Sequence, residues 1–184
     1  QQTEKAMNCF VQDGEREDII NSVLYNRALF YYHLGNIDRA EGILENLYSR
    51  FNKILRIHLK AQICELHALI LLEQKKYEEA RKLCDETIQL SHCSDDLPDV
   101  YCSLWTTIGL IKSQLDHEKA ENAFQTALCF KDSLKRKSKI ATTYMGLGNL
   151  YILLNRLEES KEHLEQAIQI AKKCNKMILF TDCL

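Results

Sequence analysis

The chain has 184 residues, of which 46% are hydrophobic and 27% charged, and its formal net charge is −2. This composition is typical of a water-soluble protein with one domain or one repeat array, and a charge so near zero excludes a strong field for nucleic acid or an anionic membrane. One proline and six glycines are too few for the many turns of a strand-rich fold, and no run of about 18 apolar residues could span a bilayer.

Residues 1–20 are predicted to be the end of a preceding helix followed by a linker, with residues 4–11 as the helical part. The first residue is Gln, and no signal-peptide pattern opens the sequence. We therefore expect the chain to be a piece of a longer protein. At the other end, residues 175–184 are predicted to start a further helix.

From residue 21 the sequence repeats at a fixed interval, in four predicted units at 21–60, 61–100, 101–140 and 141–174. One column of this repeat holds only small residues, and six others are mostly apolar or aromatic. The small column is Ala40, Ala80, Ala120 and Ser160. The others are Leu24, Cys64, Leu104 and Tyr144; Ala28, Ala68, Ile108 and Gly148; Tyr31, Leu71, Ile111 and Tyr151; Ile37, Tyr77, His117 and Leu157; Leu44, Cys84, Phe124 and Leu164; Leu47, Thr87, Ala127 and Ala167.

Within each unit the apolar positions step by three or four residues, break, and resume with the same step. This pattern indicates a helix, a turn and a second helix, and a small side chain is needed where two antiparallel helices cross closely. The turn residues are polar or turn-prone: Gly35-Asn36, Lys75-Lys76, Asp116 and Asn155-Arg156. Because one helix cannot bury its stripe alone, the units should stack into an all-α solenoid.

Residues 24–40, and residues 144–151 with Ser160, Leu164 and Ala167, resemble the tetratricopeptide repeat. The second and third units carry weaker forms of the pattern, and no unit has the family's proline. The resemblance implies a right-handed superhelix of helix pairs. The repeat in this chain is longer than the usual family repeat, which predicts that both helices are longer by nearly a turn. Such long repeats resemble those of Gram-positive peptide-sensing regulators (Rap and PlcR type) and Leu-Gly-Asn repeat scaffolds.

The resemblance also implies that the first helices line a concave groove, where a peptide would bind. The predicted groove residues are Tyr25, Asn26, Tyr32, Gln62, Glu65, Trp105, Lys112, Met145 and Asn149. Asn26 and Asn149 occupy places where the family often bonds a peptide backbone, and an amide offers both a donor and an acceptor. The alternative is helix–helix hydrogen bonding for both amides, and core packing for Trp105 and the two tyrosines.

The eight cysteines form no CxxC pair. We interpret them as small buried hydrophobes in a reducing cytoplasm, with disulfides as the alternative. His92-Cys93 is the only adjacent pair of metal-ligand types, and no HExxH occurs. The GxG at residues 146–148 lies inside a predicted helix and does not fit a phosphate loop. The basic cluster at residues 131–139 is interpreted as a solvated helix start. No enzyme activity, cofactor or metal is expected.

Two functions remain for such a chain. It is predicted to be a scaffold that holds a protein or peptide segment in its groove. The alternative is the sensor domain of a larger bacterial transcriptional or signalling regulator that a small peptide controls, and the fold alone does not decide between them. A homodimer through a chain end is a further alternative, whereas membrane and nucleic-acid partners are not expected through this region.

Overall fold

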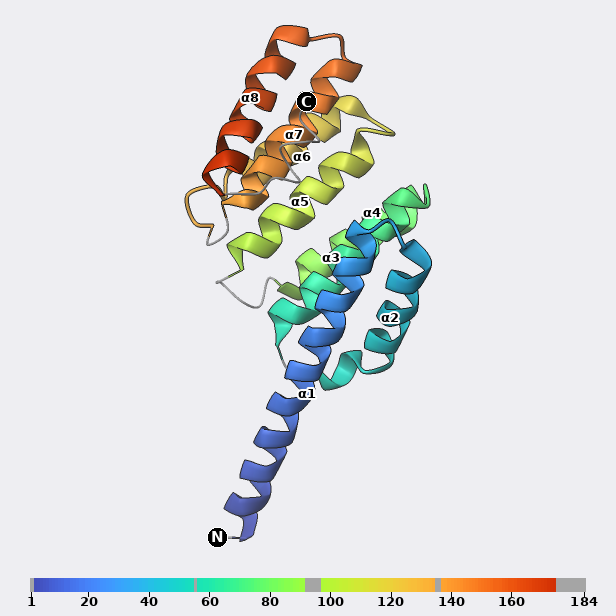
Figure 1. The fold of residues 1–184 in the computed structure, drawn as a ribbon, viewed down its shortest axis with the longest axis vertical. Coiled ribbons are helices and arrows are strands. Elements are labelled where there is room, and N and C mark those ends of the chain that lie inside the picture. The colour runs from blue at the N-terminus through green and yellow to red at the C-terminus, as the bar shows by residue number, and fades with distance from the viewer. Residues whose placement is uncertain (1, 55, 92–96, 135–136, 175–184) are drawn as a thin grey trace. The chain divides into compact units, whose positions relative to one another are not determined.

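A computed structural model describes residues 2–54, 56–91, 97–134 and 137–174, with side chains described from residue 16 onward except at 90 and 91 (Figure 1). Within these ranges all regular structure is helical, which confirms the predicted all-α class. The chain divides into two compact units, residues 1–76 and 77–184. The helices are α1 (Gln2–His33), α2 (Ile37–Ser49), α3 (Ile57–Glu73), α4 (Tyr77–Ser91), α5 (Pro98–Lys112), α6 (His117–Leu128), α7 (Ser138–Leu153) and α8 (Leu157–Lys173), with a 3-10 turn η1 (Phe51–Lys53).

The small-residue column is buried in all four repeats. Ala40, Ala80 and Ala120 are fully buried, and Ser160 is 3% exposed. Each lies in the first turn of a second helix. In the pairs α1–α2, α5–α6 and α7–α8, whose helices pack on each other, a larger side chain there would push the two helices apart. The column predicted from the sequence therefore marks the same point in each helix pair of the structure.

Three of the four turns inside the repeats share one geometry. Gly35, Lys75 and Asn155, which occupy the same position in their repeats, have φ values of +71°, +61° and +57°, and the next residue donates its N–H to a carbonyl five residues back at 2.8–2.9 Å. This left-handed helix end is the Schellman motif. The third turn has Leu115 at the matching position and instead closes on a carbonyl four residues back, at 2.7 Å. A leucine is disfavoured in the left-handed region.

The first helix is longer than predicted. α1 runs without a break from Gln2 to His33, so residues 2–20 continue the first helix of the first repeat and do not form a separate helix end and linker. No proline interrupts this segment, and Gly14 lowers helix stability by only about 1 kcal/mol relative to Ala. The further helix predicted for residues 175–184 lies outside the described residues.

Part of the extra repeat length lies in connections between repeats and not in longer helices. Residues 50–56 join α2 to α3, and the described ones among them contain η1 as their only helical turn; residues 129–137 join α6 to α7. The first connection is held by Asp18 of α1, which is 3% exposed. Its carboxylate accepts the backbone N–H of Arg56 at 3.2 Å and the side-chain Nε–H at 3.1 Å. Because this contact joins residues far apart in the chain, local sequence did not indicate it.

The core of residues 77–184 includes an aromatic ring packed against two glycines. Phe124 of α6 is fully buried. A Cβ at Gly109 of α5 or at Gly146 of α7 would lie 2.6 Å from its ring carbons, closer than real contacts allow. Gly148 has the same relation to Leu164 of α8, also at 2.6 Å. The glycines of the GxG sequence lie inside a helix, as predicted, and the structure shows that they make room there for packing.

Five cysteines have described side chains, and none of these five is joined in a disulfide. Cys64, Cys84 and Cys102 are buried, Cys129 is exposed and Cys174 is half-buried. The three buried ones fit the interpretation of cysteine as a small core hydrophobe. Cys9, Cys93 and Cys183 lie outside the residues whose side chains are described.

Candidate functional site

The predicted groove residues of residues 1–76 lie on α1 and α3. Tyr25 and Tyr32 of α1 are half-buried and pack against the core formed around Ala28, Leu44 and Ile63. Asn26, next to Tyr25, is exposed. On α3, Gln62 and Glu65 are half-buried. In this unit the two tyrosines thus contribute to packing as well as to the surface, and Asn26 presents its amide to solvent.

The side chain of Tyr32 is largely shielded from water and lies near a carboxylate. Burial raises the pKa of its hydroxyl to about 12, and the carboxylate of Glu73 at the end of α3 adds to the rise. Both causes favour the neutral phenol. Near neutral pH this side chain is therefore a hydrogen-bonding group without charge.

An alkaline titration followed by tyrosine absorbance tests this environment. Tyr32 is expected to ionise near pH 12, compared with about 10 for an ordinary tyrosine. Because the folded state holds this proton more tightly, the stabilisation is complete below pH 10 and is lost as pH rises toward 12. The Tyr32→Phe variant should lose one tyrosine from the late part of the titration. A loss from the early part, where ordinary tyrosines ionise, would contradict the burial.

In residues 77–184 the predicted groove residues lie on α5 and α7. Trp105 and Lys112 of α5 are half-buried, as is Met145 of α7. Trp105 packs against a cluster of Cys102, Ala127, Leu134 and Ile140. Its neighbour Leu104 is fully buried and takes the repeat column. Much of the indole surface therefore serves the core, as in the packing alternative for this residue.

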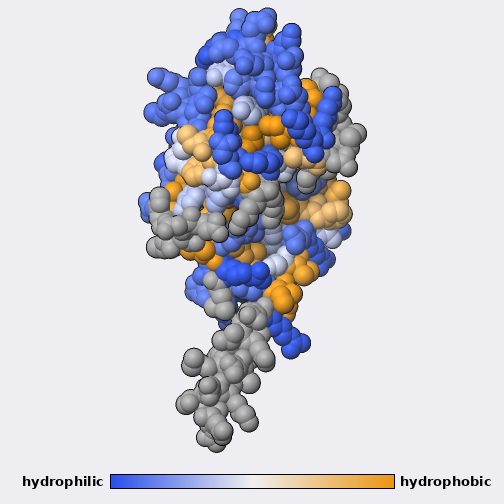
Figure 2. Space-filling model, turned by 90° about the vertical axis from the view of Figure 1, so that its left-hand side faces the viewer, coloured by the Kyte–Doolittle hydropathy of each residue, from blue (hydrophilic) through white to orange (hydrophobic). Residues whose placement is uncertain are grey.

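Asn149 is exposed on α7 and has apolar neighbours on the same side of the helix. Ile152 and Leu153, three and four residues later, are 50% and 58% exposed, and residues at these spacings are adjacent on a helix surface. The surface of the neighbouring α8 is less apolar: its region at the top of Figure 2 is largely hydrophilic. An amide in this position can form hydrogen bonds to a peptide backbone, while the two exposed aliphatic side chains beside it can contact apolar groups.

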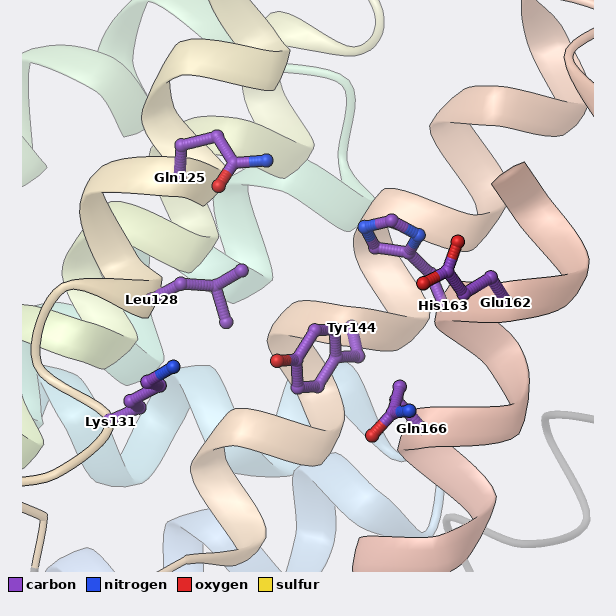
Figure 3. Close-up of a pocket in the computed structure, with 7 residues that line it drawn as sticks. All are labelled: Gln125, Leu128, Lys131, Tyr144, Glu162, His163 and Gln166. Atoms are coloured by element: carbon purple, nitrogen blue, oxygen red, sulfur yellow. The ribbon is translucent and has the colours of Figure 1, made fainter.

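A pocket on the second-helix side was not predicted (Figure 3). It has a volume of about 460 Å³, and Tyr144 of α7 lies between side chains from α6 and α8. Its lining offers one cation, one carboxylate and two amides, which suits a polar group. The lining residues are Gln125, Leu128, Lys131, Tyr144, Glu162, His163 and Gln166.

His163 is held in one orientation at this pocket. Its Nδ1 lies 2.9 Å from the carbonyl oxygen of Glu159, and its ring meets those of Tyr144 and Tyr151 edge-on, with centroids 5.8 and 5.1 Å away. A carbonyl only accepts, so Nδ1 carries a proton and Nε2 is the acceptor of the neutral ring. The pocket therefore presents a fixed imidazole beside the Tyr144 ring.

Tyr151 and two charged residues tie α6 to the turn between α7 and α8. The Tyr151 hydroxyl donates to Glu121 at 2.7 Å, and Arg156 lies over the Tyr151 ring, 4.4 Å from its centroid. Arg156 also contacts Glu121 at 3.2 Å. Burial raises the pKa of Tyr151 to about 12, and the hydrogen bond from its hydroxyl to Glu121 adds to the rise. The network fixes the helix end next to the exposed side chains of α7.

Other candidate sites receive little support within the described residues. Across them, no group of three His, Cys, Asp or Glu side chains could hold a metal ion, and no helix has the length and apolarity to cross a membrane. His92 and Cys93 lie outside these residues. In the basic segment, the Lys137 ammonium donates to the backbone carbonyl of Lys131 at 2.7 Å, so this charge partly serves to close the connection before α7.

Two segments of the chain match models of the tetratricopeptide repeat. They are residues 22–51, which contain the end of α1 and α2, and residues 141–174, which contain most of α7 and α8. The matches support the tetratricopeptide repeat family, whose members are typically non-catalytic scaffolds for protein–protein interaction. Both models describe the general repeat, so the narrower resemblance to peptide-sensing regulators or Leu-Gly-Asn scaffolds stays a prediction.

A solved structure shares the fold. The crystal structure of BtubC (BKLC) from P. vanneervenii is similar, with a TM-score of 0.63 and 19% sequence identity over 94% of this chain and 74% of that chain. A search of curated proteins gave no match.

The tetratricopeptide pattern led to the predicted groove residues and did not indicate the pocket. Tyr144 stands in a repeat column and His163 in none, and the pocket forms only because α6 and α8 lie on either side of α7. No spacing in the sequence marks Gln125 or Gln166 as their partners. A site built from three helices in this way requires the tertiary arrangement to be known.

Proposed function

We propose that the chain is a scaffold that holds a polypeptide segment against the groove side of its first helices. The observation that carries this proposal is on α7, where exposed Asn149 lies beside exposed Ile152 and Leu153. An amide can accept an N–H and donate to a C=O of an extended backbone. The aliphatic neighbours would receive apolar side chains of the same segment.

The other predicted groove residues support this arrangement in different ways. Met145 is half-buried one turn before Asn149, and a flexible thioether adapts to varied apolar groups. Lys112 of α5 adds a cation. In residues 1–76, α1 and α3 contribute two tyrosines, two amides and a carboxylate: Tyr25, Tyr32, Asn26, Gln62 and Glu65. The mixture of amides and apolar groups suits a segment with apolar anchors and few charges.

Replacing Asn149 with alanine should weaken peptide binding by about 1–3 kcal/mol, because a backbone group of the peptide would lose its partner. The probe is a linear peptide selected with this protein from a displayed random library and measured by calorimetry. The matched control is Asn122→Ala on α6, which removes an exposed amide from a second helix and should leave affinity unchanged.

Equal affinity of the Asn149→Ala and wild-type proteins would remove α7 from the site. Equal losses in Asn149→Ala and Asn122→Ala would mean that binding does not depend on the groove side. The sensor alternative uses the same groove and differs in requiring an output domain, so this experiment tests the step that both share.

A further inference from the structure

The pocket on the second-helix side has no role in the proposed peptide binding. Its volume of about 460 Å³ is that of a small-ligand site. All of its lining residues belong to one compact unit, residues 77–184, and the predicted groove residues of α7, Met145 and Asn149, are not among them. A group bound in this pocket would therefore occupy a second site.

The first repeat carries aromatic rings at the positions where the third repeat borders this pocket. Tyr48 and Phe51 stack on each other there, with ring centroids 5.4 Å apart. The third repeat has Leu128 and Lys131 at these positions, and both line the pocket. A smaller side chain and a flexible one thus replace two rings. The pocket is therefore a departure from the repeat and not a consequence of it.

Two groups on α8 offer only hydrogen-bond acceptors to the pocket. The Nδ1–H of His163 is taken up by the carbonyl oxygen of Glu159, and the other ring nitrogen, Nε2, points across the pocket toward α6 (Figure 3). The second acceptor is the carboxylate of Glu162, which has no ion-pair partner among the described residues. Both groups favour a ligand that donates hydrogen bonds.

Tyr144 adds an aromatic surface beside these acceptors. Its side chain is half-buried, and within the described part of the chain its hydroxyl has no hydrogen-bond partner. Gln125 and Gln166 bring amide oxygens from α6 and α8. A guanidinium carries five N–H donors in one plane and stacks on aromatic rings, whereas an ammonium is compact and strongly hydrated. A ring bordered by several acceptors therefore suits a guanidinium better than an ammonium.

Lys131 is the single cation among the lining residues, and its charge alone would attract an anion. This charge is carried by an exposed, flexible side chain in the connection after α6, whereas the imidazole of His163 is held in place. An anion would also meet the carboxylate of Glu162 and the lone pair of Nε2. A cationic donor is therefore the better match, and Lys131 lowers its affinity.

We propose that this pocket takes a guanidinium group, carried by an arginine side chain of a partner polypeptide. The guanidinium would lie on the Tyr144 ring and donate to Nε2 of His163 and to the carboxylate of Glu162. Because one side chain makes few contacts, its affinity alone should be of millimolar order. This binding does not depend on the proposed groove of the first helices.

Titration of the full chain with N-acetyl-L-arginine amide tests the proposal. The measurement is made at about pH 8, above the usual titration range of imidazole, and is followed by NMR of the backbone amides. The shifts should concentrate in residues 125–166. N-acetyl-L-citrulline amide, which keeps the shape of the side chain and lacks its charge, should bind at least about fivefold more weakly. The lysine analogue should also bind more weakly than the arginine probe.

Two substitutions that each remove one charge should act in opposite directions. Glu162→Gln should weaken binding of the arginine probe about two- to fivefold, the range for an exposed ion pair, and Lys131→Gln should strengthen it by a similar factor. Both residues are exposed, so the fold should be kept, and circular dichroism checks this. The matched control is Glu165→Gln, at an exposed carboxylate of α8 outside the pocket lining, which should leave affinity unchanged.

Tighter binding to Glu162→Gln, or weaker binding to Lys131→Gln, would indicate a site for anions and overturn the proposal. Equal affinity for the arginine and citrulline probes would overturn it as well. Equal losses in Glu162→Gln and Glu165→Gln would mean that the probe only follows the surface charge of α8. Free L-arginine, titrated in parallel, distinguishes the two sources of a guanidinium: tighter binding than the capped probe would assign the site to a free amino acid and not to a polypeptide.

Discussion

Replacing Phe124 with alanine is expected to lower the free energy of unfolding by about 3–5 kcal/mol, the range for a fully buried phenylalanine. The ring has 0% exposure and packs between α5 and α7, where Gly109 and Gly146 leave no Cβ to fill the space that it would vacate. The loss therefore combines the transfer of the ring with a cavity between rigid helices. Urea unfolding followed by circular dichroism measures the effect.

Leu115→Ala is the control for this prediction. It also truncates a large apolar side chain in residues 77–184, but Leu115 is 53% exposed, so the change should stay within about 0.5 kcal/mol. Similar losses in the two variants would show that the Phe124 ring is not a packing centre. In that case the role assigned to the two glycines would also be wrong.

Replacing Gly146 with alanine should destabilise the protein even though alanine is the better helix former. The new Cβ would lie 2.6 Å from Cε1 of Phe124, and overpacking of this kind costs about 1–3 kcal/mol. A gain of about 0.5–1 kcal/mol from helix propensity opposes this loss. Because the ring is enclosed on all sides, it has little space to yield, and we expect the loss to be larger.

Gly42→Ala is the matched control, since Gly42 lies within α2 and a Cβ there would meet nothing within 4 Å. This variant should gain about 0.5–1 kcal/mol, because only the propensity acts. The two glycine variants thus have opposite expected signs in the same denaturation experiment. If Gly146→Ala also stabilises the protein, the close contact with Phe124 does not exist.

A double variant separates packing from propensity. With Phe124→Leu in place, the added methyl at residue 146 should meet a smaller side chain and cost less than in the wild-type background. The difference between the two costs is the coupling energy of the pair. A coupling energy of zero would mean that the cost of Gly146→Ala arises elsewhere in α7.

The candidate site was only partly predictable from the sequence. The repeat register placed Asn149 on an accessible side of α7, and it is exposed. It did not separate the surface role of Trp105 from its packing role, because adjacent residues of a helix differ by only about 100° in direction. Leu104 takes the buried column, and Trp105 packs against the core cluster beside it. The groove role of these residues stays a prediction until binding is measured.

The amino-acid sequence alone determined the helical class, the period of the repeat, the buried small column and the position of the turns, because these follow from local spacing and from the conformational range of each residue. The tertiary structure decided which surfaces meet. It alone revealed the packing of Phe124 against Gly109 and Gly146 and the contact of Asp18 with Arg56. Each of these depends on residues far apart in the chain, and on the presence or absence of a neighbouring helix, which no local pattern records.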